Sequence, residues 1–202
     1  MWENLDNNIY ELPTIKPRPI TNFLEILVYR HPDSYDPSLD RSAPRNEFLD
    51  YMLISNTKTK EVLVIDEIQT IANYPLTTPR NEPHPNSFKD TIRAGKVTFK
   101  YKTTYHTEGA VIISNTKTLD GKIVDKNGWT KNGITKGLGY VHTSLNENGT
   151  KQYEHAYSEQ CFIPKNSEDM KQLIQTLEKW GIKEGDYIKG EVLNLKPWEV
   201  GK

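Results

Sequence analysis

Apolar and polar side chains alternate most clearly between residues 96 and 105. Val97, Phe99 and Tyr101 lie on one side of this alternation, and lysines and threonines fill most of the positions between them. A period of two places successive side chains on opposite faces of a strand, so one face is expected to be buried and the other solvated. The pattern predicts a strand over 96–105, with residues 110–114 as its continuation or its partner.

Other short apolar runs predict further strands. These runs cover residues 23–29, 51–55, 61–65 and 187–193, and the polar stretch 56–60 reads as the turn of a hairpin. Between the strands, residues 31–46 and 73–88 are rich in proline, and residues 115–139 are rich in Gly, Asn, Asp and Lys. These three segments are predicted to be loops.

One segment near the end of the chain has the period of a helix instead. Its apolar side chains form a single stripe, namely Met170, Leu173, Ile174, Leu177 and Trp180. Ser167 is expected to cap the start of this helix, with Glu168 and Asp169 in the first turn, where the helix dipole favours negative charge. Gly181 is expected to end the helix.

Many short strands and one amphipathic helix near the C-terminus predict a mainly β protein. The expected architecture is a β-sandwich or β-barrel with the helix packed against it. Residues 1–20 contain Pro13, Pro17 and Pro19 and have no periodic apolar face. They are expected to form an extended N-terminal arm that contributes little to the core, and residues 21–202 are expected to form a single domain.

Composition limits the size of the hydrophobic core and the kinds of partner that the protein can bind. Only 35% of the 202 residues are apolar, so a modest core is expected, to which eleven tyrosines and four tryptophans contribute. The net charge is −1 and there is no basic stripe, which argues against nucleic-acid binding. No apolar run reaches the length of about 18 residues that a membrane span needs.

The sequence leaves the location of the protein open. The N-terminus shows no Sec-type signal, because no basic segment is followed by an apolar one. The periplasm or cell wall is expected if the protein is active, and the cytoplasm otherwise. The oligomeric state is open as well.

Cys161 is the only cysteine of the chain, so it cannot form an intrachain disulfide. A lone cysteine is either a small buried hydrophobic residue or a reactive thiol. A thiol becomes a strong nucleophile when a base removes its proton or a positive charge lowers its pKa. His142 is a candidate base, because it lies at the end of a short apolar run upstream of Cys161.

The order of residues along the chain excludes several classes of cysteine enzyme. Papain-like enzymes have their histidine after the cysteine, and here no histidine follows Cys161. Sortases require an arginine after the cysteine, but the last arginine is Arg93. The Gly-x-Cys-Gly context of chymotrypsin-like cysteine proteases is also absent. The remaining pattern is a histidine, an interval of under twenty residues, a cysteine and then a helix.

This pattern resembles the catalytic domain of the L,D-transpeptidases. The resemblance covers about residues 138–193 and lies in Tyr140-Val141-His142, Ser158-x-x-Cys161-Phe162-Ile163, the helix that begins at Ser167 and the tail Gly185-Asp186-Tyr187-Ile188. Farther back, residues 92–97 are similar to a stretch that precedes a core strand of that family. Within the family, the chain is most similar to an uncharacterised branch of phage and bacterial proteins.

The resemblance implies a complete set of roles. Cys161 would be the nucleophile and His142 its base, oriented by the backbone carbonyl of Thr143, while Ser158 would belong to the cysteine motif. The backbone N–H groups of Gln160 and Cys161 would bind the oxyanion. Two flanking aromatic residues, Tyr140 and Phe162, would contact the substrate. That substrate would be a peptidoglycan stem peptide, and no cofactor or metal would be required.

Two departures from the family pattern keep other interpretations open. The family has glycine where this chain has Gln160, and a positive φ at a glutamine would cost roughly 1–2 kcal/mol. Phe162 follows the cysteine where the family usually has a polar residue. A catalytically decayed module with a structural or wall-binding role therefore remains the alternative, and a hydrolase of other amides is a third possibility. A zinc site is disfavoured, because no paired ligands have the usual spacing.

Overall fold

The arrangement of the chain comes from a computed structural model, which describes residues 20–36, 41–42, 48–72, 91–103, 109–121, 123–124, 139–141 and 160–200. The strands and helices of these residues, in chain order, are β1 (Ile20–Arg30), β2 (Tyr35–Asp36), β3 (Arg41–Ser42), β4 (Asp50–Asn56), β5 (Glu61–Gln69), β6 (Gly95–Lys102), β7 (Ala110–Ser114), β8 (Thr116–Lys117), β9 (Ile123–Val124), β10 (Gly139–Val141), β11 (Ile163–Pro164), α1 (Ser167–Lys179), β12 (Tyr187–Asn194) and the short 3-10 helix η2 (Pro197–Glu199).

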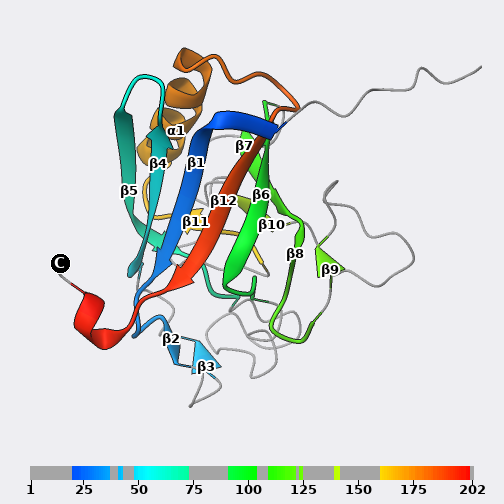
Figure 1. Ribbon diagram of the computed structural model, residues 1–202. Coiled ribbons are helices and arrows are strands. Elements are labelled where there is room, and N and C mark those ends of the chain that lie inside the picture. Colours follow the sequence, from blue (N-terminus) through cyan, green and yellow to red (C-terminus); the bar gives the residue numbers. More distant parts are fainter. Residues whose placement is uncertain are drawn as a thin grey trace, which may run out of the picture.

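Eight of the strands form one sheet in the order β10-β7-β6-β12-β1-β4-β5-β11. Its centre pairs the first strand of the chain with the last, because β1 and β12 run parallel, whereas the other neighbours are antiparallel. Figure 1 shows these two strands side by side in the middle of the sheet. The expected mainly β fold with one helix near the C-terminus is confirmed.

The sheet curls until its two ends meet. Val141 in β10 forms an isolated parallel bridge with Phe162, the residue immediately before β11. Since β10 and β11 are the outermost strands of the order, this bridge joins one end of the sheet to the other. The result is closer to a barrel than to a sandwich of two sheets.

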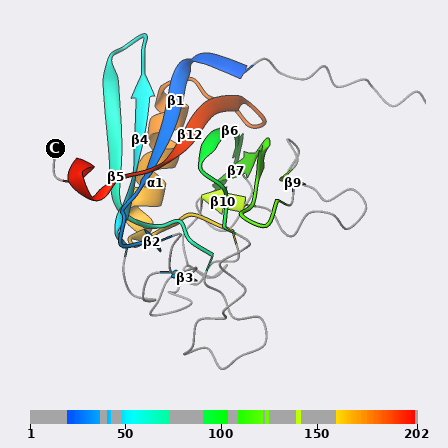
Figure 2. The same cartoon turned by 60° about the horizontal axis from the view of Figure 1, so that its bottom comes forward.

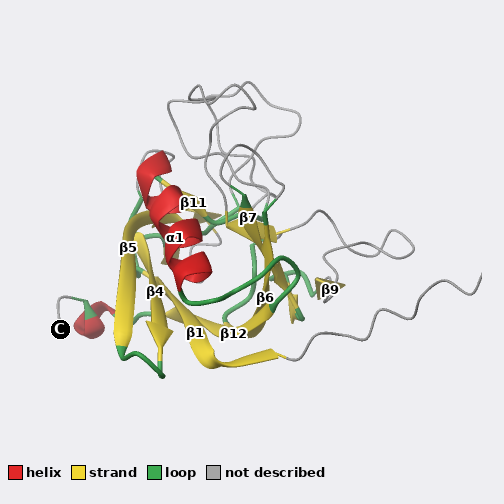
Figure 3. Ribbon diagram, turned by 90° about the horizontal axis from the view of Figure 1, so that it is seen from above, coloured by secondary structure: helices red, strands yellow, loops and turns green. Residues whose placement is uncertain are grey.

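Helix α1 lies on the concave side of the curled sheet. Figures 2 and 3 show the sheet bending around it from β5 through β1 to β6. Met170, Leu173 and Leu177 are completely buried there, and Ile174 and Trp180 pack against the same core while remaining partly exposed. The stripe predicted from the sequence therefore faces the core. Among the described residues, no helix is both long and apolar enough to span a membrane.

The core consists of the inward-facing residues of the central strands. In β6, Val97, Phe99 and Tyr101 are buried, as the alternation predicted. Thr98 breaks the pattern, because it is also buried. Its hydroxyl accepts a hydrogen bond of 3.0 Å from the side chain of Asn115, which satisfies it on the other face of the strand.

Both ends of α1 differ in detail from the expectation. The N-cap residue is Asn166, and Ser167 is the first helical residue, so Ser167 does not cap the helix; the Asn166 side chain makes no capping bond either. At the other end, Trp180 is the C-cap and Gly181 follows with a φ of +85°. The N–H groups of Gly181 and Ile182 bind the carbonyls of Glu178 and Leu177, which is a Schellman motif.

Several predicted boundaries were wrong by a few residues. β1 begins at Ile20, inside the predicted arm, and β5 continues to Gln69. The predicted loop over 31–46 contains β2 and β3, and the predicted loop over 115–139 contains β8, β9 and the start of β10. Residues 1–19 lie outside the described residues, so the extended arm stays a prediction.

Candidate functional site

Cys161 lies where both ends of the curled sheet meet. On one side, Phe162 bridges Val141 at the end of β10. On the other side, β11 pairs with the end of β5 through Ile163 and Gln69. The cysteine therefore belongs to a short segment that is held between two strands, although that segment is more than 90 residues from β5 along the chain.

The two faces of this segment have different surroundings. Val141 and Phe162 are completely buried in the main core, so Cys161, the neighbour of Phe162, is directed away from that core. The side chain of Cys161 packs instead against Ala110 and Ile112 of β7. Cys161 is half-buried, which is the degree of exposure that a working thiol needs.

Gln160 immediately precedes the cysteine in a bend and is 2% exposed. Neither polar atom of its side chain has a hydrogen-bond partner. Such groups are rare in folded proteins, because each costs roughly 1–3 kcal/mol relative to a hydrated one. The φ of Gln160 depends on Glu159, which lies outside the described residues, so the expectation that Gln160 has a negative φ or lies in a strained turn stays a prediction.

Only some of the residues predicted for the site can be placed. Cys161, Gln160 and Phe162 are described, and the backbone of Tyr140 pairs with Ile112. His142, Thr143 and Ser158 lie outside the described residues, and so does the side chain of Tyr140. The structure thus brings the segment directly before His142 next to the segment directly after Cys161.

A buried arginine beneath this segment was missed by the sequence reasoning. Arg30, at the end of β1, is only 1% exposed. Its Nε donates to Thr70 Oγ1 at 2.8 Å, Nη1 donates to the carbonyl of Ile92 at 2.6 Å and Nη2 donates to the carbonyl of Thr70 at 3.2 Å. The guanidinium carbon lies 5.9 Å from the ring centre of Phe162, within range of a cation–π contact.

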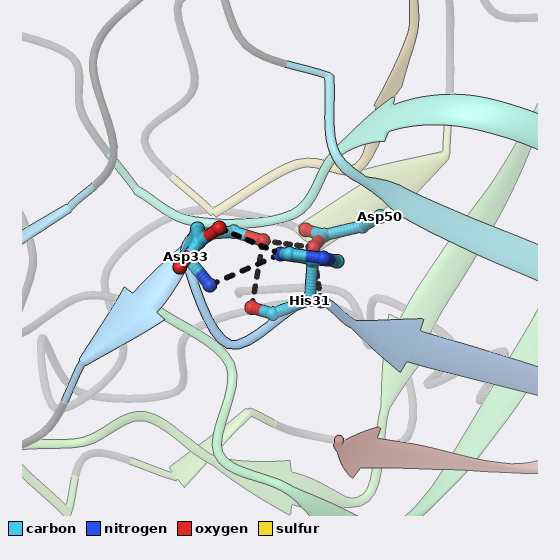
Figure 4. A network of polar contacts seen from close by, with 4 residues as sticks. His31, Asp33 and Asp50 are labelled. Atoms are coloured by element: carbon cyan, nitrogen blue, oxygen red, sulfur yellow. Dashed lines mark hydrogen bonds and ion pairs between the residues drawn. The ribbon is translucent and has the colours of Figure 1, made fainter. Parts of the chain in front are cut away.

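Asp50, the first residue of β4, is the acidic counterpart of this arginine. One carboxylate oxygen accepts from the N–H of Thr70 at 3.2 Å and from its hydroxyl at 2.5 Å. The other accepts from the N–H of His31 at 2.9 Å and from the hydroxyl of Ser34. Figure 4 shows Asp50 beside His31, whose ring nitrogen accepts from the N–H of Asp33 at 3.1 Å.

Burial raises the pKa of Asp50 above its ordinary value, against the lowering effect of its hydrogen bonds with Ser34 and Thr70 and of the charge on Arg30. Thr70 connects the two charged residues, because its hydroxyl accepts from Arg30 and donates to Asp50. The cluster of Arg30, Asp50, Thr70 and Ser34, called the Arg30 cluster below, therefore fixes the end of β5 next to Phe162.

The sequence contains a signal for part of this cluster. Leu24, Ile26 and Val28 alternate with more exposed residues, and the same alternation directs Arg30 inward. When a charged residue occupies the next inward-facing position of such a strand, its charge is expected to be buried and therefore paired. The partners of Arg30 are determined by the order of the strands in the sheet, and the local sequence pattern does not show that order.

Among the described residues, no cluster of three or more His, Cys, Asp or Glu side chains could hold a metal ion. Comparison of the chain with protein-family models, with curated proteins and with solved structures gives no match. The interpretation of the site therefore rests on its own residues and geometry.

Proposed function

We propose that the protein is a cysteine acyltransferase or hydrolase of the L,D-transpeptidase type that acts on peptidoglycan stem peptides. The observation that carries the proposal is the bridge between Val141 and Phe162. These residues are the immediate chain neighbours of His142 and Cys161, the two groups that the chemistry requires. The bridge is parallel, so Cys161 would be the neighbour of Tyr140 rather than of His142. Cys161 and His142 would then form a diagonal pair on the same face of the sheet, and a histidine ring can reach along such a diagonal towards a thiol.

In the proposed reaction, His142 takes the proton of the Cys161 thiol. The thiolate attacks a peptide carbonyl of the stem peptide, and the tetrahedral intermediate collapses to a thioester as the terminal D-amino acid leaves with its amine protonated. An amine of a second stem peptide, or water, then attacks the thioester and regenerates the thiol. The backbone N–H groups of Gln160 and Cys161 would hold the oxyanion, worth roughly 3–4 kcal/mol per donor in related reactions.

The surroundings of Cys161 support this role. The cysteine is half-buried rather than part of the main core, while the residue that follows it is anchored in that core. Phe162 lies against the buried guanidinium of Arg30, which is itself held by three hydrogen bonds. A nucleophile on a rigid support is held close to its reactive geometry.

One observation favours the second candidate, a decayed module with a structural or wall-binding role. Cys161 packs against Ala110 and Ile112, and an apolar neighbourhood raises the pKa of a thiol. If no base offsets this effect, the thiol would be inert. The two candidates therefore differ in whether Cys161 forms an acyl-enzyme.

Mass spectrometry of the intact protein separates the two candidates. The protein is incubated with a carbapenem and, separately, with a tetrapeptide stem, and Cys161→Ser is the control variant. The proposal predicts one carbapenem adduct on Cys161 and release of the terminal D-amino acid, with neither result in the control. A native protein that remains free of adduct and releases no D-amino acid would support the decayed module.

A further inference from the structure

Strand β5 pairs with β4 along one side, but its other side is only partly used. The last two residues of β5 pair with β11, and the carbonyl of Glu67 accepts from the N–H of Lys165. Among the described residues, no strand pairs with this side of β5 over residues 61–66. Figure 1 shows this part of β5 at one border of the sheet. Such an unpaired strand edge is a template for pairing with another chain.

The hydrogen bonding of the neighbouring strands shows which residues of β5 direct their backbone groups to the open side. The N–H of Thr57, directly after β4, donates to the carbonyl of Phe23 in β1. Odd-numbered residues of β4 therefore bond to β1, and even-numbered ones bond to β5. These even-numbered residues lie opposite odd-numbered residues of β5. Val62 and Val64 consequently direct their N–H and C=O groups to the open side.

The side chains of the same two valines are exposed as well. Val62 is 56% exposed and Val64 is 50% exposed, whereas Leu63 and Ile65 are buried in the core on the concave face. Folded proteins usually protect a sheet edge with charges, proline or a very short strand, because an apolar edge promotes association. A partner strand accounts for both the open backbone groups and the exposed valines.

We propose that β5 pairs antiparallel with β5 of a second copy of this chain, about a two-fold axis beside Leu63. In this register Val62 of one copy lies opposite Val64 of the other, and the two valines exchange both of their backbone hydrogen bonds. The two-fold axis repeats this pair, so the same surface serves both copies. The proposal goes beyond the function proposed for Cys161 and does not depend on it.

Charge favours this register over its neighbours. With the axis beside Leu63, Lys60 of each copy lies opposite Asp66 of the other, and opposite charges across a strand pair are stabilising. An axis at Val64 would place Val62 against Asp66 and would extend the pairing into the part of β5 that β11 occupies. An axis at Val62 would place Lys60 against Val64 and would extend the pairing into the hairpin turn.

Sedimentation velocity of the full chain over a range of concentrations measures this association. The proposal predicts a monomer–dimer equilibrium with a dissociation constant on the order of 10 µM or below. Val64→Lys should raise this constant about tenfold or more, since it brings a charge into the apolar centre of the contact. Ile123→Lys is the matched control, because Ile123 is 54% exposed and lies on β9, and it should change the constant by less than about twofold.

Circular dichroism checks that both lysine variants remain folded. A wild type that is monomeric at every concentration would overturn the proposal and leave the edge of β5 to a different partner. A dimer that Val64→Lys does not weaken would overturn it too, because the copies would then associate through another surface.

Charge reversal tests the register itself. Lys60→Asp and Asp66→Lys each place like charges opposite one another, so each should weaken the dimer about fivefold or more at low salt. Aspartate is chosen because Lys60 has a φ of +60°, which aspartate tolerates well. The double variant restores opposite charges and should return the dissociation constant to within about twofold of the wild-type value. A double variant that associates no more tightly than the single variants would show that the two positions do not face each other, and the proposal would be wrong.

Discussion

At the scale of single residues, the most informative positions are of two kinds. At some of them a polar side chain is buried, and at others the packing leaves no room for any side chain. Arg30 and Asp50 are each 1% exposed and are joined through Thr70. Alternation along β1 predicts that Arg30 points inward, but no local pattern shows that Asp50 faces it across the sheet. The same limit applies to Gln160, which the sequence marked only as a departure from a family pattern.

Loss of the Asp50 carboxylate is expected to destabilise the protein strongly. Asp50 accepts four hydrogen bonds, and in Asp50→Asn the amide group would face donors of Thr70. We predict a loss on the order of 3 kcal/mol in the free energy of unfolding, measured by urea denaturation. Asp33→Asn, at a side chain that is 79% exposed, is the control. A loss below about 1 kcal/mol for Asp50→Asn would contradict the account of the Arg30 cluster.

Gly190 lies in β12, at the centre of the sheet. A Cβ at this position would lie 2.4 Å from the backbone oxygen of Ile26 and 2.4 Å from the ring of Phe99. Because a strand backbone cannot yield as a side chain can, we predict that Gly190→Ala costs about 3 kcal/mol in unfolding free energy. The neighbouring exposed position offers a control, since Lys189→Ala should change stability by less than about 0.5 kcal/mol. Equal effects of the two substitutions would contradict the close packing of β12 between β1 and β6.

At the scale of elements, the sequence predicts α1 and the central strands well, because each has a clear period. It predicts the ends of elements less well, because caps depend on single hydrogen bonds. Asn166 rather than Ser167 precedes the helix, whereas Gly181 ends it through a Schellman motif. Two-residue strands such as β11 have no period at all, and the site depends on one of them.

The buried stripe of α1 should contribute much of the stability of the fold. Leu173 is completely buried between the helix and the sheet, and Gln172 next to it is exposed. We predict that Leu173→Ala lowers the unfolding free energy by about 2–5 kcal/mol, while Gln172→Ala leaves it nearly unchanged. Chemical denaturation of the two variants measures the difference. A small effect of Leu173→Ala would mean that the helix does not pack on the concave face.

The C-terminal end of α1 is joined to the β4–β5 hairpin by an acid-sensitive contact. Glu61 accepts from Lys179 at 2.7 Å and from the indole N–H of Trp180 at 2.6 Å. The Lys179 hydrogen bond, followed by those from Thr59 and Trp180, lowers the pKa of Glu61 from 4.5 to about 2. Folding therefore favours the ionised form, so this contribution is present above pH 4.5 and is lost as the pH falls towards 2.

This contact gives a pH-dependent prediction. Glu61→Gln should lower the Tm at pH 7, and the difference from the wild type should shrink between about pH 4.5 and 2. Thermal denaturation across this range measures it, with Glu168→Gln, at an exposed helical acid with an exposed lysine partner, as the control. A Tm difference that does not change with pH would show that the charge of Glu61 is not what holds the helix end.

At the scale of the whole molecule, composition and period were sufficient for the fold class but not for the topology. Short strands and one helix predicted a mainly β protein, and the structure has one. The parallel pairing of β1 with β12 and the bridge from Val141 to Phe162 join residues that are distant along the chain. Such contacts depend on how the whole sheet buries its apolar face, and a short segment of sequence carries no information about that.

The closure of the sheet also determines what could be predicted about the site. The order of His142 and Cys161 along the chain suggested that the two act together, and the bridge joins Val141 and Phe162, the residues next to them. The support from Arg30 beneath Phe162 was not visible in the sequence, because it comes from β1 at the opposite end of the chain. The central claim is therefore that the closed sheet presents Cys161 as a thiolate to His142.

The rate of alkylation of native Cys161 as a function of pH tests this claim most directly. Wild-type protein and His142→Ala are treated with a small neutral alkylating reagent between pH 5 and 10, roughly the range over which a cysteine thiol titrates, and circular dichroism checks that both remain folded. The account predicts a wild-type midpoint at least one unit below the ordinary thiol value of about 8.5, and a shift back towards that value in His142→Ala. A midpoint at or above about 8.5 that is the same in both proteins would contradict it.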